Sequence, residues 1–460
     1  MESNHTSVIS HLPEELLDQV IGSLCKNSRR TISACTLVSR RWLRIARPHL
    51  FATVIRPPSR AYSFSDFFDF LVFHPHIARL IENIDLSGTT RSADDPDFFL
   101  KIPYLDLQSF AALLPQLPRL QQLQVDCLRL KLLSSVYFRS PPVPLRHLTI
   151  GPSLVGSRDG SGLLCLSSFL RIFSLDTLKI LHIDWSAGFP NEDYFGPLAP
   201  HSVRLNRLVI RQERAIVEFH RYFSMVLSPG ALQYLETVCP DQHAVRSLHT
   251  FLDTAGTNVT HLKLNVQSLV NKHGQAGKSD RLAITHIPRI RFALLVASSG
   301  LRSPSRDRSL RLVGKAITAC VNLRILGLVV PCDLDTPPED AACTVYADII
   351  DHNLPASCSQ LRLELTINGP VPAVFERHRV ALWDINFLGI FARRSPGLEE
   401  GVTVEVMNAG SFEDFEAVFN VVEVAISDVL PSIKAAGLLR VYPSTIRMFY
   451  DYHLSGLYNI

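Results

Sequence analysis

Three stretches decide the fold: LNRLVI at residues 205–210, LQYLET at 232–237 and VTHLKL at 259–264. Each has an apolar residue at its first and fourth positions, and its sixth residue is Ile, Thr or Leu. Apolar residues at alternate positions over so short a run favour a half-buried strand. The first positions are 27 residues apart in both steps, as 232 − 205 and 259 − 232 show. This equal spacing predicts a repeated structural unit that begins with a strand.

The same phrase recurs along most of the chain. Further copies begin at Leu120, Leu145, Leu178, Ile287 and Leu323, with weaker copies at Ile81, Leu361 and Val402. Residues 213–226 and 241–255, between copies, place apolar residues at helical spacing, and Asp241 suits the N-cap of the second helix. A short strand and a helix bury their apolar faces only when copies stack. We predict an α/β horseshoe with parallel strands over residues 55–411; a single globular α/β domain is the alternative.

This region resembles the irregular leucine-rich-repeat arrays that follow F-boxes, although the Asn or Cys of the full repeat pattern is missing eight residues after the first position of each phrase. The resemblance implies a concave surface built from outward strand positions. Its mixed charges suit a protein partner better than nucleic acid. We expect partner contacts from His182, Asp184 and Arg211, with help from an arginine-containing loop at residues 300–311. Residues 412–460 should form a helical cap, beginning with a helix over 412–433.

The first fifty residues predict three short helices. Leu12-Pro13-Glu14-Glu15 is typical of a helix start, because proline suits the first turn and acidic side chains favour the N-terminal end of the helix dipole. The following apolar residues fall at helical spacing up to Leu24. A second apolar helix is expected over residues 32–38, and a third from Ser39 onward.

Residues 8–54 resemble an F-box in three phrases: LPEELL at 12–17, ISACTLVSRRW at 32–42 and ARPHLF at 46–51. The basic linker at residues 26–30 departs from the aspartate-containing turn of many members. The resemblance implies binding to a Skp-type adaptor, which docks on a cullin scaffold, while Leu24 and Ile45 hold the motif's own core. A generic helical cap is the alternative. The implied adaptor contacts are Leu12, Pro13, Leu16, Leu17, Val20, Leu37, Val38 and Trp42.

Composition excludes several classes of protein. The 460 residues carry 46 basic and 43 acidic side chains, without the basic face of a general nucleic-acid binder. We expect a cytoplasmic or nuclear chain that does not bind membranes, because it has no apolar signal segment or span and its nine cysteines are scattered. Metalloprotease, Walker and nucleophile-elbow motifs are missing, and we expect no metal or cofactor.

The sequence therefore predicts a non-catalytic substrate-recognition subunit of an SCF-type ubiquitin ligase. The alternative is a leucine-rich-repeat interaction scaffold that does not assemble into a ligase, and a hydrolase is a distant third. The completeness of residues 12–42 favours the first reading.

Overall fold

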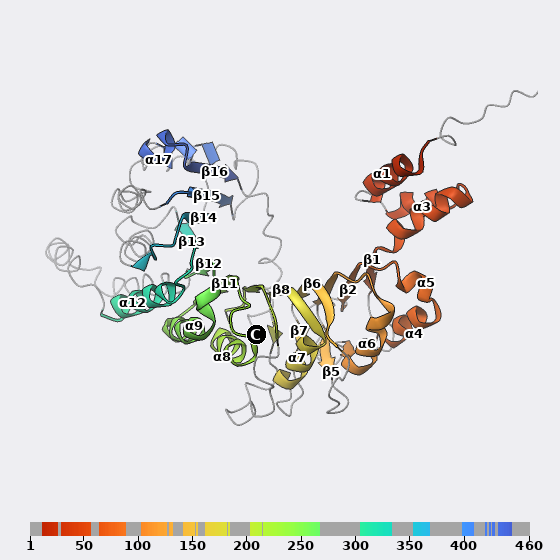
Figure 1. Ribbon diagram of the computed structural model, residues 1–460, viewed down its shortest axis with the longest axis horizontal. Helices are drawn as coiled ribbons and strands as arrows, with labels where there is room; N and C mark the ends of the chain where they lie inside the picture. Colours follow the sequence, from red (N-terminus) through yellow and green to blue (C-terminus); the bar gives the residue numbers. More distant parts are fainter. Residues whose placement is uncertain are drawn as a thin grey trace, which may run out of the picture. The chain divides into compact units, whose positions relative to one another are not determined.

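The computed structural model has two compact units, Met1–Leu198 and Ala199–Ile460. Both contain helices and parallel strands, which confirms the predicted α/β class (Figure 1). The structure describes residues 12–25, 29–56, 64–88, 103–126, 128–131, 141–151, 153–154, 162–181, 183–184, 203–213, 215–266, 304–333, 353–368, 398–408, 419–420, 423–424, 426–427 and 431–443.

The first unit begins with the three predicted helices: α1 (Glu14–Cys25), α2 (Arg29–Cys35) and α3 (Arg40–Phe51). We call residues 12–52 the helical module. Helix α2 ends three residues earlier than expected, so Leu37 and Val38 lie in a turn. The physical reason is that Ser39 is the N-cap of α3. Its backbone is extended, and its side chain accepts a hydrogen bond from the Trp42 amide at 3.3 Å, so a new helix begins after it.

A small apolar core and polar contacts between helices hold the helical module together. Glu14 of α1 pairs with Arg41 at 3.8 Å and also with Arg44. Asp18 lies 2.8 Å from His49, which adds a second link between α1 and α3. The buried core residues are Leu17, Ile21, Ile32, Cys35, Ile45 and Ala46, with Leu12, Leu24, Trp42 and Leu50 packed against them.

The rest of the first unit contains two sets of parallel strands. One set pairs in the order β1 (Thr53–Arg56), β2 (Asn83–Ser87), β4 (Gln122–Asp126), β6 (Val143–Ile150) and β8 (Phe173–Ile180). The other pairs in the order β3 (Tyr104–Asp106), β5 (Arg129–Lys131), β7 (Ser153–Leu154) and β9 (Ile183–Asp184). The helices are α4 (Ser65–Phe73), α5 (Pro75–Ala78), α6 (Leu107–Leu113), η3 (Leu114–Gln116) and α7 (Gly162–Arg171).

Aromatic rings link these helices and strands through the core. Phe68 of α4 lies 5.8 Å from Phe110 of α6, measured between ring centroids. Phe110 in turn lies 6.4 Å from Phe169 of α7, and Phe169 lies 5.6 Å from Phe173 of β8. All four rings are buried, so successive helices share one continuous core.

One predicted copy of the repeated phrase is wrong by three residues. The phrase beginning at Leu178 was expected to form a strand, but β8 ends at Ile180. In the register with β6, Leu145 pairs with Leu175 and Leu148 with Leu178. The true copy therefore begins at Leu175. Apolar residues also occur at 178, 181 and 183, so the sequence fits the phrase in two registers.

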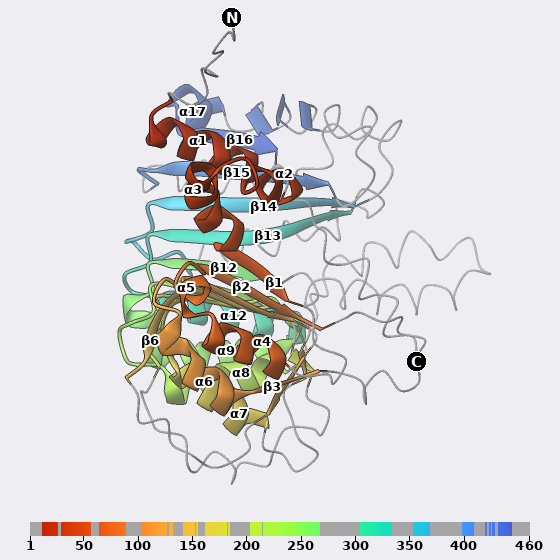
Figure 2. The same cartoon turned by 90° about the vertical axis from the view of Figure 1, so that its right-hand side faces the viewer.

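In the described part of the second unit, seven strands pair in parallel in chain order, and the later ones are labelled in Figure 2. They are β10 (Arg207–Ile210), β11 (Tyr234–Val238), β12 (His261–Asn265), β13 (Ile325–Asp333), β14 (Gln360–Asn368), β15 (Gly401–Asn408) and β16 (Leu439–Pro443). The described helices of this unit are α8 (Ile216–Val226), α9 (Gln242–Ala255), η5 (Gly256–Asn258), α12 (Pro304–Thr318) and α17 (Pro431–Ala435). Figure 1 shows α8, α9 and α12 along one side of these strands.

The two helices predicted from apolar spacing are confirmed. Helix α8 buries Ile216, Phe219, Tyr222, Phe223 and Val226. Helix α9 begins after Asp241, whose carboxylate accepts a hydrogen bond from the Ala244 amide at 2.9 Å. The strand prediction is confirmed as well, because Leu208 and Leu262 lie in strands and are 0% and 1% exposed.

Two other expectations in this unit are wrong. The loop expected over residues 300–311 becomes helical at Pro304, where the missing proline N–H costs nothing in the first turn, and Val313, Ala316 and Ile317 anchor the helix in the core. The expected helical cap contains a strand, β16, which extends the sheet beyond residue 412. The copy expected at Ile287 lies outside the described residues, as does most of the helix expected over 412–433.

Backbone hydrogen bonds join the repeats where their strands begin. The Gln233 carbonyl accepts the Thr260 and His261 amides at 2.9 and 3.0 Å, and the Arg324 carbonyl accepts the Ser359 and Gln360 amides at 2.9 and 3.0 Å. The same two-amide arrangement occurs at the carbonyls of Ala52, Glu82, Gln121, Asn206 and Thr260. The main chain therefore sets the register of these uneven repeats without an asparagine ladder.

Candidate binding surfaces

The helical module exposes large apolar side chains outside its core. Leu16 and Val20 are 46% and 48% exposed and lie one helical turn apart on α1. Leu37 and Val38, in the turn after α2, are 86% and 65% exposed. We call these four residues the apolar set. Their exposure is typical of side chains that a partner covers, because the module's core is already filled by other residues.

The other expected adaptor contacts divide between surface and core. Pro13 is exposed, while Leu12 and Trp42 are half-buried against the core. Leu17 differs from the expectation: it is 1% exposed and lies in the core, so its side chain is not available to a partner. The cause is the helical period, which turns Leu16 and Leu17 about 100° apart. Ile45 is buried and Leu24 packs against the core, as expected.

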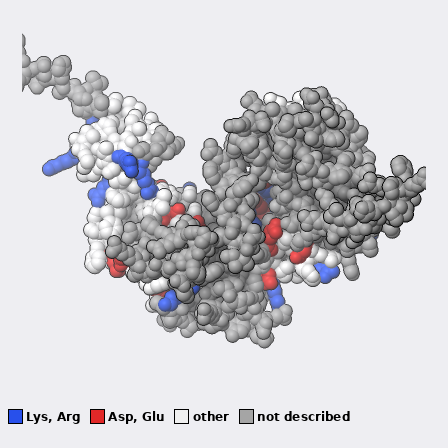
Figure 3. Space-filling view, turned by 180° about the vertical axis from the view of Figure 1, so that it is seen from behind, with Lys and Arg blue, Asp and Glu red and all other residues white. Residues whose placement is uncertain are grey.

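Basic side chains accompany the apolar set on the helical module. In Figure 3, Lys and Arg side chains project from the small helical part at the upper left. Arg29, Arg30, Arg40 and Arg44 are exposed there. Arg29 also donates a hydrogen bond to the Thr53 carbonyl, which ties the start of α2 to β1. A partner of this module therefore meets both apolar and positive surface.

A second candidate surface lies on the strands of the second unit, on the face opposite the buried leucines. Side chains alternate along each strand, so Leu235 and Leu262 point to the core while their neighbours point away. We call the outward side the strand face. Parallel register aligns Arg207, Tyr234 and His261 in one row and Glu236, Lys263 and Arg362 in the next. Chemically unlike side chains thus meet across neighbouring strands.

Glu236 is the centre of one ionic cluster on the strand face. Its carboxylate lies 2.9 Å from Arg211 and 3.9 Å from Lys263, and Lys263 also contacts Glu364. Burial raises the pKa of Glu236, but the charges of Lys263 and Arg211 outweigh burial and hold this pKa below its ordinary value. The Glu236 carboxylate therefore remains ionised at neutral pH.

Gly327 lets Lys263 cross the sheet to Glu364. Gly327 is the register partner of Lys263 on β13, and Glu364 lies on β14, one strand further. A Cβ atom at residue 327 would stand 3.2 Å from both Cβ and Cγ of Lys263. The glycine thus leaves room for the lysine side chain, which is only 23% exposed.

An aromatic row adjoins the ionic cluster. The Arg207 guanidinium lies over the Tyr234 ring, with its Cζ 3.9 Å from the centroid, and the His261 ring follows at 6.1 Å. Burial and the neighbouring Glu236 raise the pKa of Tyr234 to about 12, so its phenol stays protonated. The phenol donates a hydrogen bond to Glu236 at 3.1 Å.

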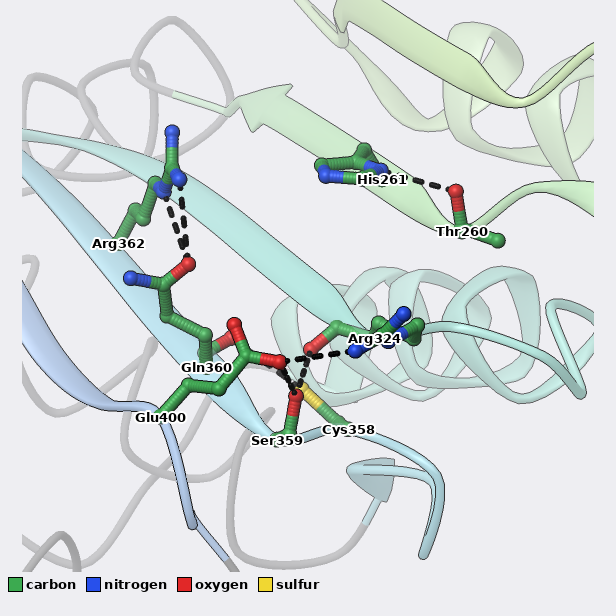
Figure 4. A network of polar contacts seen from close by, with 8 residues as sticks. All are labelled: Thr260, His261, Arg324, Cys358, Ser359, Gln360, Arg362 and Glu400. Atoms are coloured by element: carbon green, nitrogen blue, oxygen red, sulfur yellow. Dashed lines mark hydrogen bonds and ion pairs between the residues drawn. The ribbon is translucent and has the colours of Figure 1, made fainter.

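Figure 4 shows a second polar network, where β13, β14 and β15 begin. The Glu400 carboxylate accepts hydrogen bonds from Ser359 at 2.9 Å and from Arg324 at 3.0 Å, and these contacts lower the pKa of Glu400. Both nitrogens Nε and Nη2 of Arg362 donate to the Gln360 side-chain oxygen, at 3.2 and 3.1 Å. The network fixes the orientation of two arginines beside His261.

The three expected partner residues do not all belong to one described unit. Arg211 contacts Glu236, as described above. Asp184 belongs to β9 in the four-stranded set of the first unit, not to the main strands, because the repeated phrase there was assigned three residues too late. His182 lies outside the described residues. Sequence reasoning missed Glu236, His261, Arg324, Arg362, Glu364 and Glu400, although the alternation in YLETV, HLKLN and LRLEL could have identified the strand residues.

Cys239, Cys320, Cys358 and the buried His220 are poor candidates for catalysis. Burial raises the pKa of Cys239 and Cys320 to about 12 and that of Cys358 to about 11, which suppresses the reactive thiolates. Burial also lowers the pKa of His220 to about 3. Within the described ranges, no cluster of three or more His, Cys, Asp or Glu side chains could hold a metal ion. Cys343 lies outside those ranges.

No protein-family model matches the chain, and no curated protein matches its sequence. Among the described helices, none has the length and apolar character needed to cross a membrane.

Proposed function

We propose that this chain is the substrate-recognition subunit of an SCF-type ubiquitin ligase. In this proposal the helical module is an F-box that binds a Skp-type adaptor and, through it, a cullin scaffold. The strands and helices that follow form an irregular leucine-rich-repeat horseshoe that holds a protein substrate. The chain is non-catalytic and acts in the cytoplasm or nucleus, and other subunits transfer ubiquitin.

The apolar set is the observation that carries this proposal. Leu16, Val20, Leu37 and Val38 remain exposed although the module has a filled core of its own. Fully burying one such side chain contributes about 1.5–3 kcal/mol. Because the four side chains are only partly exposed, a partner that covers the apolar set gains roughly twice that amount from apolar burial. Leu16, Leu37 and Val38 also fall within the phrases that resemble an F-box, and Val20 lies between the first and second phrases.

The strand face supports the second half of the proposal. It presents charged, aromatic and hydroxyl side chains that the core does not use. Carboxylates of Glu236, Glu364 and Glu400 alternate there with basic groups. Such a surface suits a particular protein better than the uniform negative charge of nucleic acid.

The adaptor interface can be tested by placing charge in the apolar set. We expect the double variant Leu16→Asp/Val20→Asp to bind a purified Skp-type adaptor at least about 100-fold more weakly, because complex formation would bury two unpaired carboxylates. Isothermal titration calorimetry on the full chain measures this loss. Both residues are about half exposed, so the variant should keep its fold.

Val321→Asp is the matched control, because it places the same charge at a 60% exposed valine in the second unit. This variant should bind the adaptor as the unchanged chain does. If the unchanged chain does not bind the adaptor, the chain is an interaction scaffold outside the ligase. Equal affinity of the double variant and the unchanged chain would also contradict the proposed interface.

A further inference from the structure

The described carboxylates of the strand face do not neutralise all its arginines. Arg211 and Lys263 pair with Glu236 and Glu364, and Arg324 pairs with Glu400. Arg207 and Arg362 have no carboxylate partner among the described residues. Arg207 lies over the Tyr234 ring, and Arg362 contacts the neutral amide of Gln360. Neither guanidinium group therefore forms an ion pair with a described carboxylate, although Glu364 follows Arg362 on β14 and Glu405 lies on the neighbouring β15.

These two arginines lie on opposite sides of His261. Arg207 is on β10 and Arg362 on β14, while His261 is on β12 between them. Burial lowers the pKa of His261, and the charges of Arg362, Arg324 and Arg207 lower it further. His261 therefore stays neutral at neutral pH, and the positive potential around it comes from the arginines. Four strand spacings separate β10 from β14, about 19 Å at the backbone.

The contacts of Arg362 resemble those of an arginine that holds an oxyanion. Its Nε and Nη2 converge on a single oxygen of Gln360, at 3.2 and 3.1 Å. The Gln360 amide is itself fixed by donating to the Thr403 hydroxyl at 3.2 Å. A carboxylate or phosphate makes a stronger hydrogen bond to guanidinium than a neutral amide does. An incoming anion can therefore replace the amide oxygen at this fork. Glu400 already shows that a carboxylate fits beside Arg324 and Ser359 (Figure 4).

We propose that the strand face around His261 binds an extended acidic segment of a protein, with oxyanionic side chains held by Arg207 and Arg362. The shared chemistry is an oxyanion on two separated guanidinium groups, from either glutamate or phosphoserine. The interspersed Glu236, Glu364 and Glu400 disfavour a continuous phosphate backbone. This inference rests on the proposed function in one respect: it assigns the chemical class of substrate to the same strand face.

Labelled peptide pools test the inference directly by fluorescence polarisation on the full chain. One pool carries two glutamates at varied separation in a random background, a second carries two phosphoserines, and a third carries two serines. We expect an acidic pool to bind at least about tenfold more tightly than the serine pool. Tighter binding of only the glutamate or only the phosphoserine pool identifies the source of the oxyanion and supports the inference. Equal binding of all three pools overturns it.

Variants then test the two arginines. Arg207→Gln and Arg362→Gln should each weaken binding of the preferred acidic pool about tenfold. Arg362→Lys should recover part of the loss, because lysine keeps the charge without the two-nitrogen fork. Arg246→Gln removes the same charge from an exposed position on α9 and should leave binding unchanged. Full binding by both Gln variants, or an equal loss in the α9 control, contradicts the inference.

Adaptor binding separates this inference from the proposed function. The variant Leu16→Asp/Val20→Asp should bind acidic peptides as the unchanged chain does, because its changes lie in the helical module. Acidic-peptide binding in a chain that fails to bind the adaptor leaves the inference standing and removes the ligase proposal. Adaptor binding without any preference for acidic pools contradicts the inference and leaves the ligase proposal standing.

Discussion

A single buried histidine links pH to the stability of the second unit. The His220 side chain is 0% exposed, its Nε2 lies 3.0 Å from the Thr237 hydroxyl, and its ring stacks on Phe251 at 5.9 Å. Burial lowers its pKa from 6.5 to about 3. The unfolded chain therefore takes up a proton as the pH falls below 6.5, whereas the folded chain does so only near pH 3. Stability from this residue is full above pH 6.5 and decreases as the pH falls from there towards about 3.

We predict that His220→Gln makes the free energy of unfolding less dependent on pH. The unchanged chain should lose at most about 1.4 kcal/mol per pH unit through this histidine on acidification, and the variant should not. At neutral pH the variant should be less stable, because glutamine does not reproduce the stack on Phe251. Urea unfolding from neutral pH to about pH 4 measures both effects. His243→Gln, at an exposed position of α9, is the control. Parallel pH curves for His220→Gln and the unchanged chain would contradict this account.

At the scale of elements, the sequence predicts a helix most reliably where the spacing of apolar residues and an N-cap residue indicate the same start. Helix α9 combined apolar spacing with an aspartate at its start, and both are confirmed. Strand β8 was misplaced because leucines at 175, 178 and 181 satisfy the same phrase. Only its hydrogen bonds to β6 select one register. Local pattern thus determines the type of an element, while its register depends on a neighbour distant in sequence.

The strand face shows why a site is harder to predict than a strand. Alternation along each strand identifies which side chains face outward. It does not identify their partners, because Lys263 and Glu364 are 101 residues apart in sequence. Nor does the sequence reveal why residue 327 is a glycine within a strand. That requirement arises from the Lys263 side chain, which comes from β12.

We predict that Gly327→Ala has opposite effects in two backgrounds. In the unchanged chain the added methyl group displaces Lys263 from Glu364, and the variant should be about 1 kcal/mol less stable. In a Lys263→Gly background both close contacts are removed, because residue 263 then has neither Cβ nor Cγ, and alanine at residue 327 should stabilise the strand by about 0.5–1 kcal/mol relative to glycine. Denaturant unfolding of the four chains of this double-mutant cycle measures the coupling. The same effect of Gly327→Ala in both backgrounds would show that Lys263 does not require the glycine.

At the scale of the whole molecule, each described strand of the second unit pairs only with its neighbours in chain order. Contacts between helices follow the same order, from α8 to α9 and from α9 to α12. The stability of such an array is approximately a sum of local units and the interfaces between neighbours. Removing an element at one end should therefore destabilise the adjacent strand most and distant strands least.

Removing the last described strand tests this view. A chain ending after residue 430 lacks α17 and β16, and so loses the hydrogen bond from the Val402 amide to the Leu438 carbonyl. We expect faster hydrogen exchange in β15 and little change in β11 and β12. We also expect self-association at high protein concentration, because the unpaired edge of β15 can pair with another chain. Hydrogen-exchange mass spectrometry and light scattering measure these two effects. A chain ending after Pro443 keeps β16 and is the matched control, which should behave as the unchanged chain does. Loss of protection throughout β10–β13 in the shorter chain would mean that the second unit unfolds as one cooperative body rather than as neighbouring units.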